Sequence, residues 1–513
     1  MNIKKAKEEI KYAIQAYLAK DEFGEYRIPA VRQRPVLLMG APGIGKTAVM
    51  EQVARECGVA LVSYSITHHT RQSAIGLPFI SKKEYGGKEY TVTEYTMSEI
   101  IASVYDKMEE TGLQEGILFI DEINCASETL APAMLQFLQC KTFGAHKVPE
   151  GWLIAAAGNP PEYNKSVREF DVVTLDRVKK IDVEPDFSVW KEYAYQQGIH
   201  GAILSYLEIR KDHFYAMETT VDGKRFVTAR GWEDLSTILK VYEDMNLPVE
   251  EGLIYQYLQQ HCRIAKDFAN YLDLYRKYRT DYRVDDILQG KYTKQAVTKL
   301  QDAPFDERLS VMGLLLSRLS EGFRGAYEAD LTVTGLHGAL LELKERFNSP
   351  YCKETPWENL FTGLVEEREA AFAKERKAGL LEKTAEHACM RELERLRFFL
   401  AEGKRNGCRE KEDTFALVKG LFAKEAEGRE NAIADASAML DNAFAFLEEA
   451  FGAGQEMVIF ITELTTNFYS VKFISENGSE KYYRYNAELL FDEKQKTILQ
   501  DIEKAKTELN LLF

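Results

Sequence analysis

The sequence lacks Cys-x-x-Cys pairs, and we expect no secretory leader. Its seven cysteines stand singly, their number is odd, and no two of them form a Cys-x-x-Cys pair. A disulfide framework needs an even set of cysteines, so this pattern favours reduced thiols in the cytoplasm. The first stretch, MNIKKAKEEIKYAIQAYL, is basic and amphipathic and contains no apolar signal core. We therefore expect a cytoplasmic protein.

The chain also lacks long apolar runs and an excess of basic residues. No window approaches the roughly 18 uninterrupted apolar residues of a membrane-spanning helix, so we expect no membrane span. Lys and Arg number 66 against 81 Asp and Glu, which gives a net charge of −15. Binding to nucleic acid regardless of its sequence requires clustered basic residues, so the charge disfavours that class of protein without excluding a local basic patch.

What the chain does contain is an alternation of strand-like and helix-like segments up to about residue 185. Its 513 residues exceed one hydrophobic core, and about three domains are expected. Short apolar runs alternate with amphipathic stretches, which predicts a parallel sheet flanked by helices. Strands are expected at 36–39, 60–66, 116–120 and 152–157, and helices at 1–20, 97–110 and 128–139.

The remainder of the chain has a mainly helical pattern. Leucines and alanines spaced by three to five residues over 380–400 predict an apolar stripe on a charged helix. That stripe fits the core of a helical hairpin, or alternatively a coil that binds a partner. MVIFIT (457–462) and NFYSVKFI (467–474) resemble strands, and the following Asn477-Gly478 pair predicts a hairpin turn. A charged helix is expected at 494–511.

The stretch GAPGIGKT lies between a strand-like run and a helix-like run and has the spacing of a phosphate-binding loop. Its glycines allow backbone N–H groups to approach phosphate oxygens, and the following helix offers unpaired N–H groups and a positive dipole end. Lys46 should contact the β- and γ-phosphates, and the Thr47 hydroxyl should bind Mg²⁺. The alternative is a chance glycine-rich turn. The predicted nucleotide-binding residues are Gly40, Ala41, Pro42, Gly43, Ile44, Gly45, Lys46, Thr47 and Ala48.

Two carboxylates follow the buried run GILFI. Asp121 stands where that strand ends, and ligands of parallel α/β sheets bind at this end. Asp121 and Thr47 are the residues predicted to bind Mg²⁺. Glu122 is the predicted general base that polarises the attacking water. The alternative is that both acids merely cap the next helix.

The next apolar strand, WLIAAA, ends in Gly-Asn-Pro. Asn159 should emerge at the same edge of the sheet as Asp121. A neutral amide at that place can bond both the γ-phosphate and the water without adding negative charge. The alternative is an asparagine that only forms the turn before Pro160.

Taken in order, GAPGIGKT, ILFIDEIN, AAGNP, TLDR and TARGW resemble the motifs of an AAA+ ATPase of the MoxR branch, over about residues 20–290. The resemblance implies that Asn159 is the sensor 1 residue and that Arg177 is the arginine finger that reaches a neighbouring subunit's nucleotide. Arg168 is a rival for that role, and Arg177 could instead be a salt-bridged helix residue.

The resemblance also implies a role for Arg230 as the sensor 2 residue on a helical lid. The alternative is an ion pair with Glu233 or Asp234. Guanidinium is always charged and offers a planar donor fork to phosphate, which suits both predicted arginine roles.

Further segments fit the same resemblance. Residues 67–95 resemble the insertion that lines the pore of MoxR rings, and 142–151 resemble a pre-sensor hairpin. The adjacent His68 and His69 would point in opposite directions on an extended chain, which disfavours a metal site. Cys125 replaces the arginine that often follows the DEIN motif, which puts the local contact between subunits in doubt.

The predicted fold is therefore an α/β P-loop NTPase (AAA+) core with a parallel sheet, an α-helical lid and a mainly helical C-terminal region that ends in a small β-hairpin. The predicted domains are 1–185, 186–290 and 291–513. The expected activity is ATP hydrolysis with ATP and Mg²⁺. The resemblance implies a self-assembled ring, expected to be a hexamer, that remodels a protein client. It also implies a separate von Willebrand factor A domain protein as partner. The alternatives are a nucleic-acid motor and a nucleotide-gated scaffold.

Overall fold

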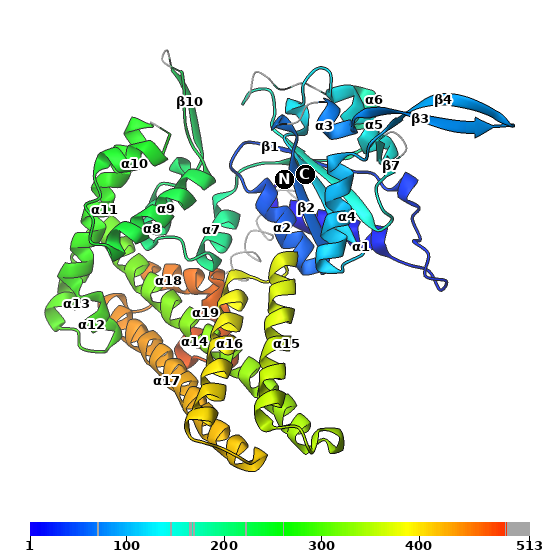
Figure 1. Ribbon diagram of the computed structural model, residues 1–513. Coiled ribbons are helices and arrows are strands. Elements are labelled where there is room, and N and C mark those ends of the chain that lie inside the picture. Colours follow the sequence, from blue (N-terminus) through cyan, green and yellow to red (C-terminus); the bar gives the residue numbers. More distant parts are fainter. Residues whose placement is uncertain are drawn as a thin grey trace, which may run out of the picture. The chain divides into compact units, whose positions relative to one another are not determined.

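The computed structural model describes residues 1–68, 71–143, 146–163, 167, 170–220, 223–259, 261–487 and 489 (Figure 1). The chain divides into two units, which are described separately. Unit 1 contains Met1–Val189, Thr228–Arg230 and Thr362–Cys389. Unit 2 contains Trp190–Val227, Gly231–Phe361 and Met390–Phe513.

Unit 1 is built on a five-stranded parallel sheet in the order β2-β5-β8-β1-β9. The four predicted strands are confirmed as β1, β2, β5 and β8. Residues 116–120 of β5 and all of β8 are buried, as expected for strands covered by helices on both faces. The strands are β1 (Val36–Gly40), β2 (Ala60–Ser65), β5 (Gly116–Asp121), β8 (Trp152–Gly158) and β9 (Lys179–Val183). The edge strand β9 was not predicted, because its sequence KKIDV buries only alternate residues.

Helices cover this sheet, and the three predicted in this region are confirmed as α1, α4 and α5. The helices are α1 (Ile3–Leu18), α2 (Lys46–Cys57), α3 (Arg71–Ile75), α4 (Glu99–Thr111), α5 (Ala131–Cys140) and α6 (Val172–Leu175). Side chains of α4 and α5 such as Val104 and Phe137 pack with Leu118 and Trp152 of the sheet in one core. This core fixes the strand ends on which the predicted site depends.

Both segments that resembled insertions contain antiparallel hairpins. Strands β3 (Pro78–Tyr85) and β4 (Lys88–Tyr95) form the longer hairpin, and β6 (Thr142–Phe143) and β7 (His146–Lys147) the shorter one. In Figure 1 the β3–β4 ribbon extends away from the sheet, and every residue of it is exposed or half-buried. Its stability therefore comes from cross-strand pairing and not from a core.

Unit 2 is mainly helical and contains one small antiparallel pair, β10 (Ala216–Thr220) with β11 (Gly223–Val227). Two long helices, α14 and α17, pack along each other. Helices α7, α9, α15 and α16 contribute residues to both units. The helices are α7 (Phe187–Gln196), α8 (Gly201–Ile209), α9 (Ala229–Asp244), α10 (Glu251–Tyr257), α11 (Cys262–Tyr282), α12 (Val284–Leu288), α13 (Lys294–Gln301), α14 (Phe305–Asn348), α15 (Trp357–Ala378), α16 (Lys383–Arg405) and α17 (Lys411–Phe451).

The predicted C-terminal β-hairpin is wrong. Residues 457–462 and 467–474 lie in helices α18 (Gln455–Thr466) and α19 (Phe468–Asn477). Met457, Phe460, Ile461 and Leu464 are buried at helical spacing, so the apolar run covers one helix face. Gly478 ends α19 with a φ of 78°, and residues 480–487 are again helical. The helix expected at 494–511 lies outside the described residues.

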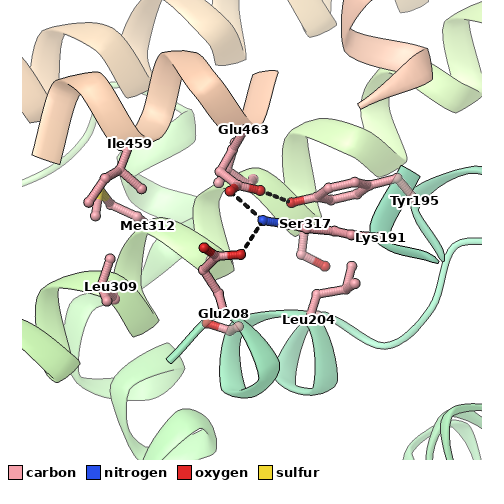
Figure 2. A pocket seen from close by; sticks show the side chains of 13 residues that line it. Lys191, Tyr195, Leu204, Glu208, Leu309, Met312, Ser317, Ile459 and Glu463 are labelled. Carbon is pink, nitrogen blue, oxygen red and sulfur yellow. Dashed lines mark hydrogen bonds and ion pairs between the residues drawn. The ribbon is translucent and has the colours of Figure 1, made fainter. Parts of the chain in front are cut away.

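A buried ion network joins α18 to two helices of unit 2 (Figure 2). The Lys191 Nζ of α7 lies 2.6 Å from a Glu208 oxygen of α8 and also bonds Glu463 of α18. The Tyr195 hydroxyl donates to Glu463 at 2.7 Å. Glu463 is thus a buried acidic residue on a mainly apolar helix, and donors from other helices satisfy it. None of the described helices combines the length and apolarity needed to cross a bilayer.

Candidate functional site

Polar side chains gather at the carboxyl ends of three neighbouring strands. Gly40 ends β1, Asp121 ends β5 and Gly158 ends β8, and these strands are adjacent in the order β5-β8-β1. Parallel strands present their carboxyl ends at one edge of a sheet, which is where ligands of α/β sheets bind. The predicted residues of the three motifs therefore share one edge.

The loop between β1 and α2 has the backbone that its glycines permit. Gly43 and Gly45 have φ values of 73° and 92°, which side-chain-bearing residues rarely adopt. Gly40 lies close to β9, and a Cβ added to it would meet the Val183 carbonyl oxygen at 2.6 Å. A Cβ added to Gly45 would meet nothing within 4 Å, so the space beside the loop is open there for a phosphate.

Lys46 is buried and folds back over this loop. Its Nζ donates to the carbonyl oxygens of Gly40 (2.8 Å) and Ala41 (2.9 Å) and to Asn159 Oδ1 (2.8 Å). Burial lowers the pKa of Lys46 to about 8; Asp121 opposes that shift and Arg230 adds to it. The loop thus holds a cation at the place where phosphates would bind.

Thr47 and Asp121 form a hydrogen-bonded pair, Thr47 Oγ1 donating to Asp121 Oδ2 at 2.9 Å. A hydroxyl and a carboxylate are oxygen ligands of the kind that Mg²⁺ prefers, and Mg²⁺ keeps several waters besides. The two residues predicted to hold the metal are therefore adjacent and chemically suited to it.

Glu122 occupies an unusual backbone position next to Asp121. Its φ of 56° lies in the left-handed region, and such a position costs on the order of 1–3 kcal/mol for a non-glycine residue. Its N–H donates to Asp121 Oδ1 (2.8 Å), and its Oε2 lies 3.4 Å from the Ser65 hydroxyl at the end of β2. These contacts turn the carboxylate out of β5 and towards the end of β2.

The sequence analysis missed Asn124, the last residue of the DEIN motif. Asn124 is buried, and its Nδ2 donates to the Asn159 carbonyl oxygen at 2.8 Å. Its Oδ1 is buried without a partner among the described residues. A Cβ added to Gly158 would lie 2.6 Å from that oxygen, so the amide sits directly against the glycine. The sequence shows an asparagine three residues after Asp121, but it does not show that this side chain bonds the backbone of Asn159.

A comparison with known protein families agrees with this geometry. Residues 36–174 match the family model described as "ATPase family associated with various cellular activities (AAA)". The matched range contains the loop, Asp121, Glu122 and Asn159.

The chain carries an AAA ATPase domain. Among solved structures, one similar chain is described as "crystal structure of a putative ATPase from Cytophaga hutchinsonii ATCC 33406". It is 16% identical, with a TM-score of 0.20, and the match covers 36% of this chain and 51% of that chain. This chain thus matches about half the length of that protein. No curated protein matches it.

A segment from beyond the matched range contacts the loop of the AAA domain. The Arg230 N–H donates to the Gly43 carbonyl oxygen at 3.3 Å, and a Cβ added to Gly43 would lie 2.9 Å from Thr228. The Arg230 side chain is exposed, and its charge contributes to the lowered pKa of Lys46. The structure therefore brings this predicted arginine to the candidate site.

The second predicted arginine lies elsewhere in unit 1, just beyond the matched range. Arg177 is exposed, follows α6 and donates to Gln139 near the end of α5. The structure thus gives Arg177 a partner outside the loop at residues 40–47. The rival Arg168 lies outside the described residues.

Proposed function

We propose that this protein is a MoxR-like AAA+ ATPase that hydrolyses ATP with Mg²⁺. In this proposal the chain assembles into a hexameric ring and uses the energy to remodel a protein client in the cytoplasm. The single observation that carries the ATPase part is the convergence of Lys46, Thr47, Asp121 and Asn159 at one edge of the sheet. Triphosphate hydrolysis requires a phosphate-binding loop, a pair of metal ligands and a neutral amide close together. These residues supply all three.

The chain's own residues supply most of the chemistry. Lys46 exchanges its carbonyl partners for phosphate oxygens and so neutralises charge on them. Glu122 accepts a proton from the attacking water, and the Asn159 amide orients that water and the γ-phosphate. Thr47 and Asp121 would hold Mg²⁺, which when bound would neutralise charge on the phosphate oxygens.

Two exposed features support assembly into a ring. Arg177 lies on the surface, where it is accessible to a neighbouring subunit. Close to it in sequence, Val172 and Val173 are 83% and 56% exposed, which is unusual for adjacent valines. An apolar patch beside an accessible arginine suits a subunit contact that delivers the arginine in trans.

The exposed hairpin β3–β4 supports a protein client. Phe79, Ile80, Tyr85 and Tyr90 are exposed large hydrophobic side chains on it. Aromatic residues supply much of the energy of protein recognition, whereas the net negative charge of the chain disfavours nucleic acid as the client. A separate von Willebrand factor A domain protein remains the proposed partner, on the resemblance alone.

The test is a comparison of Lys46→Ala with Glu122→Gln. Lys46→Ala should abolish ATP binding. Glu122→Gln should bind ATP with unchanged affinity and lose turnover by about 10²–10⁴-fold, because the amide cannot accept the proton. ATP hydrolysis by Glu122→Gln at the parent rate would refute the assignment of the base.

A further inference from the structure

Unit 2 contains a second cavity, formed by residues that the nucleotide site does not use. Its volume is about 480 Å³, and its walls come from the turn between α7 and α8 and from helices α9, α11, α12 and α14. Cavities that bind small molecules measure about 300–1,000 Å³. The size therefore suits a metabolite.

Four basic side chains line this cavity, one on α9 (Lys240), one on α11 (Arg279) and two on α14 (Arg318 and Arg324). Two of them meet at Gly198: a Cβ added to that glycine would lie 2.6 Å from Arg324 Nη1 and 3.8 Å from Lys240 Nζ. Lys240 also donates to the Gly198 carbonyl oxygen. Lys240 and Arg324 therefore approach the same part of the wall, while Arg279 and Arg318 line the cavity from their own helices.

Three of the four acidic residues of the wall already have basic partners. Asp285 and Glu321 both pair with Arg318, each at 2.7 Å. Glu243 is held by His200 and by Arg276, and these contacts lower the pKa of Glu243 to about 2 against the effect of its burial. These acids are therefore bonded to cations other than Lys240, Arg279 and Arg324.

The remaining charges favour an anion. Among the residues that the structure describes, the side chains of Arg279 and Arg324 form no ion pair or hydrogen bond with another residue. Asp244, the fourth acid of the wall, is exposed to solvent. Two guanidinium groups that face a cavity without an acidic partner form a site suited to an oxyanion, because each offers a planar fork of donors.

Hydroxyl groups line the same cavity. A Cβ added to Gly201 would lie 2.5 Å from the Tyr275 hydroxyl and 2.7 Å from Ser317 Oγ, so both oxygens lie near one point. Burial raises the pKa of Tyr275 far above its ordinary value, so this group remains a neutral donor. Apolar walls are formed by Ile199, Leu204 and Leu314. Tyr195, Leu204 and Ser317 also line the smaller cavity in Figure 2.

We propose that this cavity binds a small phosphate-bearing ligand. The guanidinium groups of Arg279 and Arg324 hold its phosphate, the hydroxyls of Tyr275 and Ser317 donate to it, and the apolar walls contact the rest of the molecule. A phosphate suits the site better than a single carboxylate does, because it carries up to two negative charges and can accept from both guanidinium groups at once.

The experiment uses the full-length Lys46→Ala variant, in which the nucleotide loop no longer competes for phosphates, and pyrophosphate as the probe in calorimetry. We expect saturable binding that weakens at least tenfold when Arg279→Gln and Arg324→Gln are added. Arg405→Gln, an exposed arginine of α16, is the matched control and should leave the affinity unchanged. Because the background has no working nucleotide loop, the result does not depend on the proposed ATPase activity.

If the double variant does not fold, Arg279→Gln alone serves as the test. Arg279 is exposed, so this single variant should fold, and it should weaken pyrophosphate binding severalfold. Absence of pyrophosphate binding, or binding that neither arginine substitution alters, would overturn the proposal. Succinate bound as tightly as pyrophosphate would overturn the choice of phosphate.

Discussion

At Lys46, burial and hydrogen bonding act on the ammonium group in opposite directions. Burial lowers the pKa of Lys46 to about 8, while three oxygen acceptors hold the protonated form in place. Phosphates bound beside this group would favour its protonated form, because they add negative charge. The affinity for nucleotide should therefore depend on pH.

We predict that the affinity for ATP falls as the pH rises through about 8. Above that pH the free protein must take up a proton to bind, and at pH 9 the affinity should be about tenfold lower than at pH 7. Calorimetry in buffers of different ionisation enthalpy measures both the affinity and the proton uptake. Lys46→Arg does not titrate in this range, and a parent slope no steeper than that of Lys46→Arg would contradict the prediction.

Asn124 and Gly158 form the contact that fixes the end of β8. Gly158→Ala places a methyl group where the Asn124 amide lies, 2.6 Å from its Oδ1. We predict a loss of about 1–3 kcal/mol in stability and a fall in ATP turnover, because Asn159 loses its support. Thermal unfolding and an ATPase assay measure the two effects.

Gly420→Ala is the matched control, because a Cβ there meets nothing within 4 Å on α17. It should leave turnover unchanged and stabilise the protein by about 0.5–1 kcal/mol. Equal behaviour of the two variants would show that the Asn124 contact is unimportant.

At the scale of elements, the ion network of Figure 2 joins helices that are distant in sequence. Lys191 and Glu463 are separated by 272 residues, and their side chains are only 7% and 10% exposed. Removing one member of a buried pair leaves a charge without compensation, which usually costs more than the pair itself contributes. Helix α18 should therefore depend on this contact for its docking.

We predict that Lys191→Met destabilises the protein by about 3–5 kcal/mol, because Glu463 remains buried without its cation. Lys191→Met combined with Glu463→Leu should recover most of that loss. Urea unfolding followed by helical circular dichroism measures both. If the double variant is no more stable than Lys191→Met alone, the buried charge is not the cause.

At the scale of the whole molecule, the proposed ring makes each active site depend on two chains. In that arrangement Glu122 and Arg177 of one site come from different subunits. In the single chain Arg177 is exposed, as this arrangement requires, and its side chain donates to Gln139 of the same chain.

We predict that mixing Arg177→Ala subunits with Glu122→Gln subunits restores part of the ATP turnover. Mixed rings contain interfaces at which an intact Glu122 meets an intact Arg177. Each variant alone should be nearly inactive, since an arginine supplied in trans can contribute about 10³–10⁵-fold to the rate. Turnover of the mixture no higher than that of the separate variants, in mixed rings verified by mass photometry, would exclude a trans role for Arg177.

The sequence by itself determined the features that depend on neighbouring residues. The phosphate-binding loop follows from the spacing of Gly40, Gly45, Lys46 and Thr47, and β5 follows from an uninterrupted apolar run that only a doubly covered strand can bury. Asp121 and Asn159 could be placed because each directly follows such a strand. Local chemistry was sufficient for these elements.

Only the tertiary structure decided which distant residues meet. The order of the strands, the bond from Asn124 to Asn159 and the contact of Arg230 with Gly43 join segments that no local pattern connects. The same holds for 457–474, where a short apolar run fits a strand or a helix equally well. In the folded chain Glu463 bonds Lys191, and the Asn467 side chain accepts from the Tyr469 N–H. These contacts stabilise the helical form of 457–474, and they depend on residues that the fold brings near.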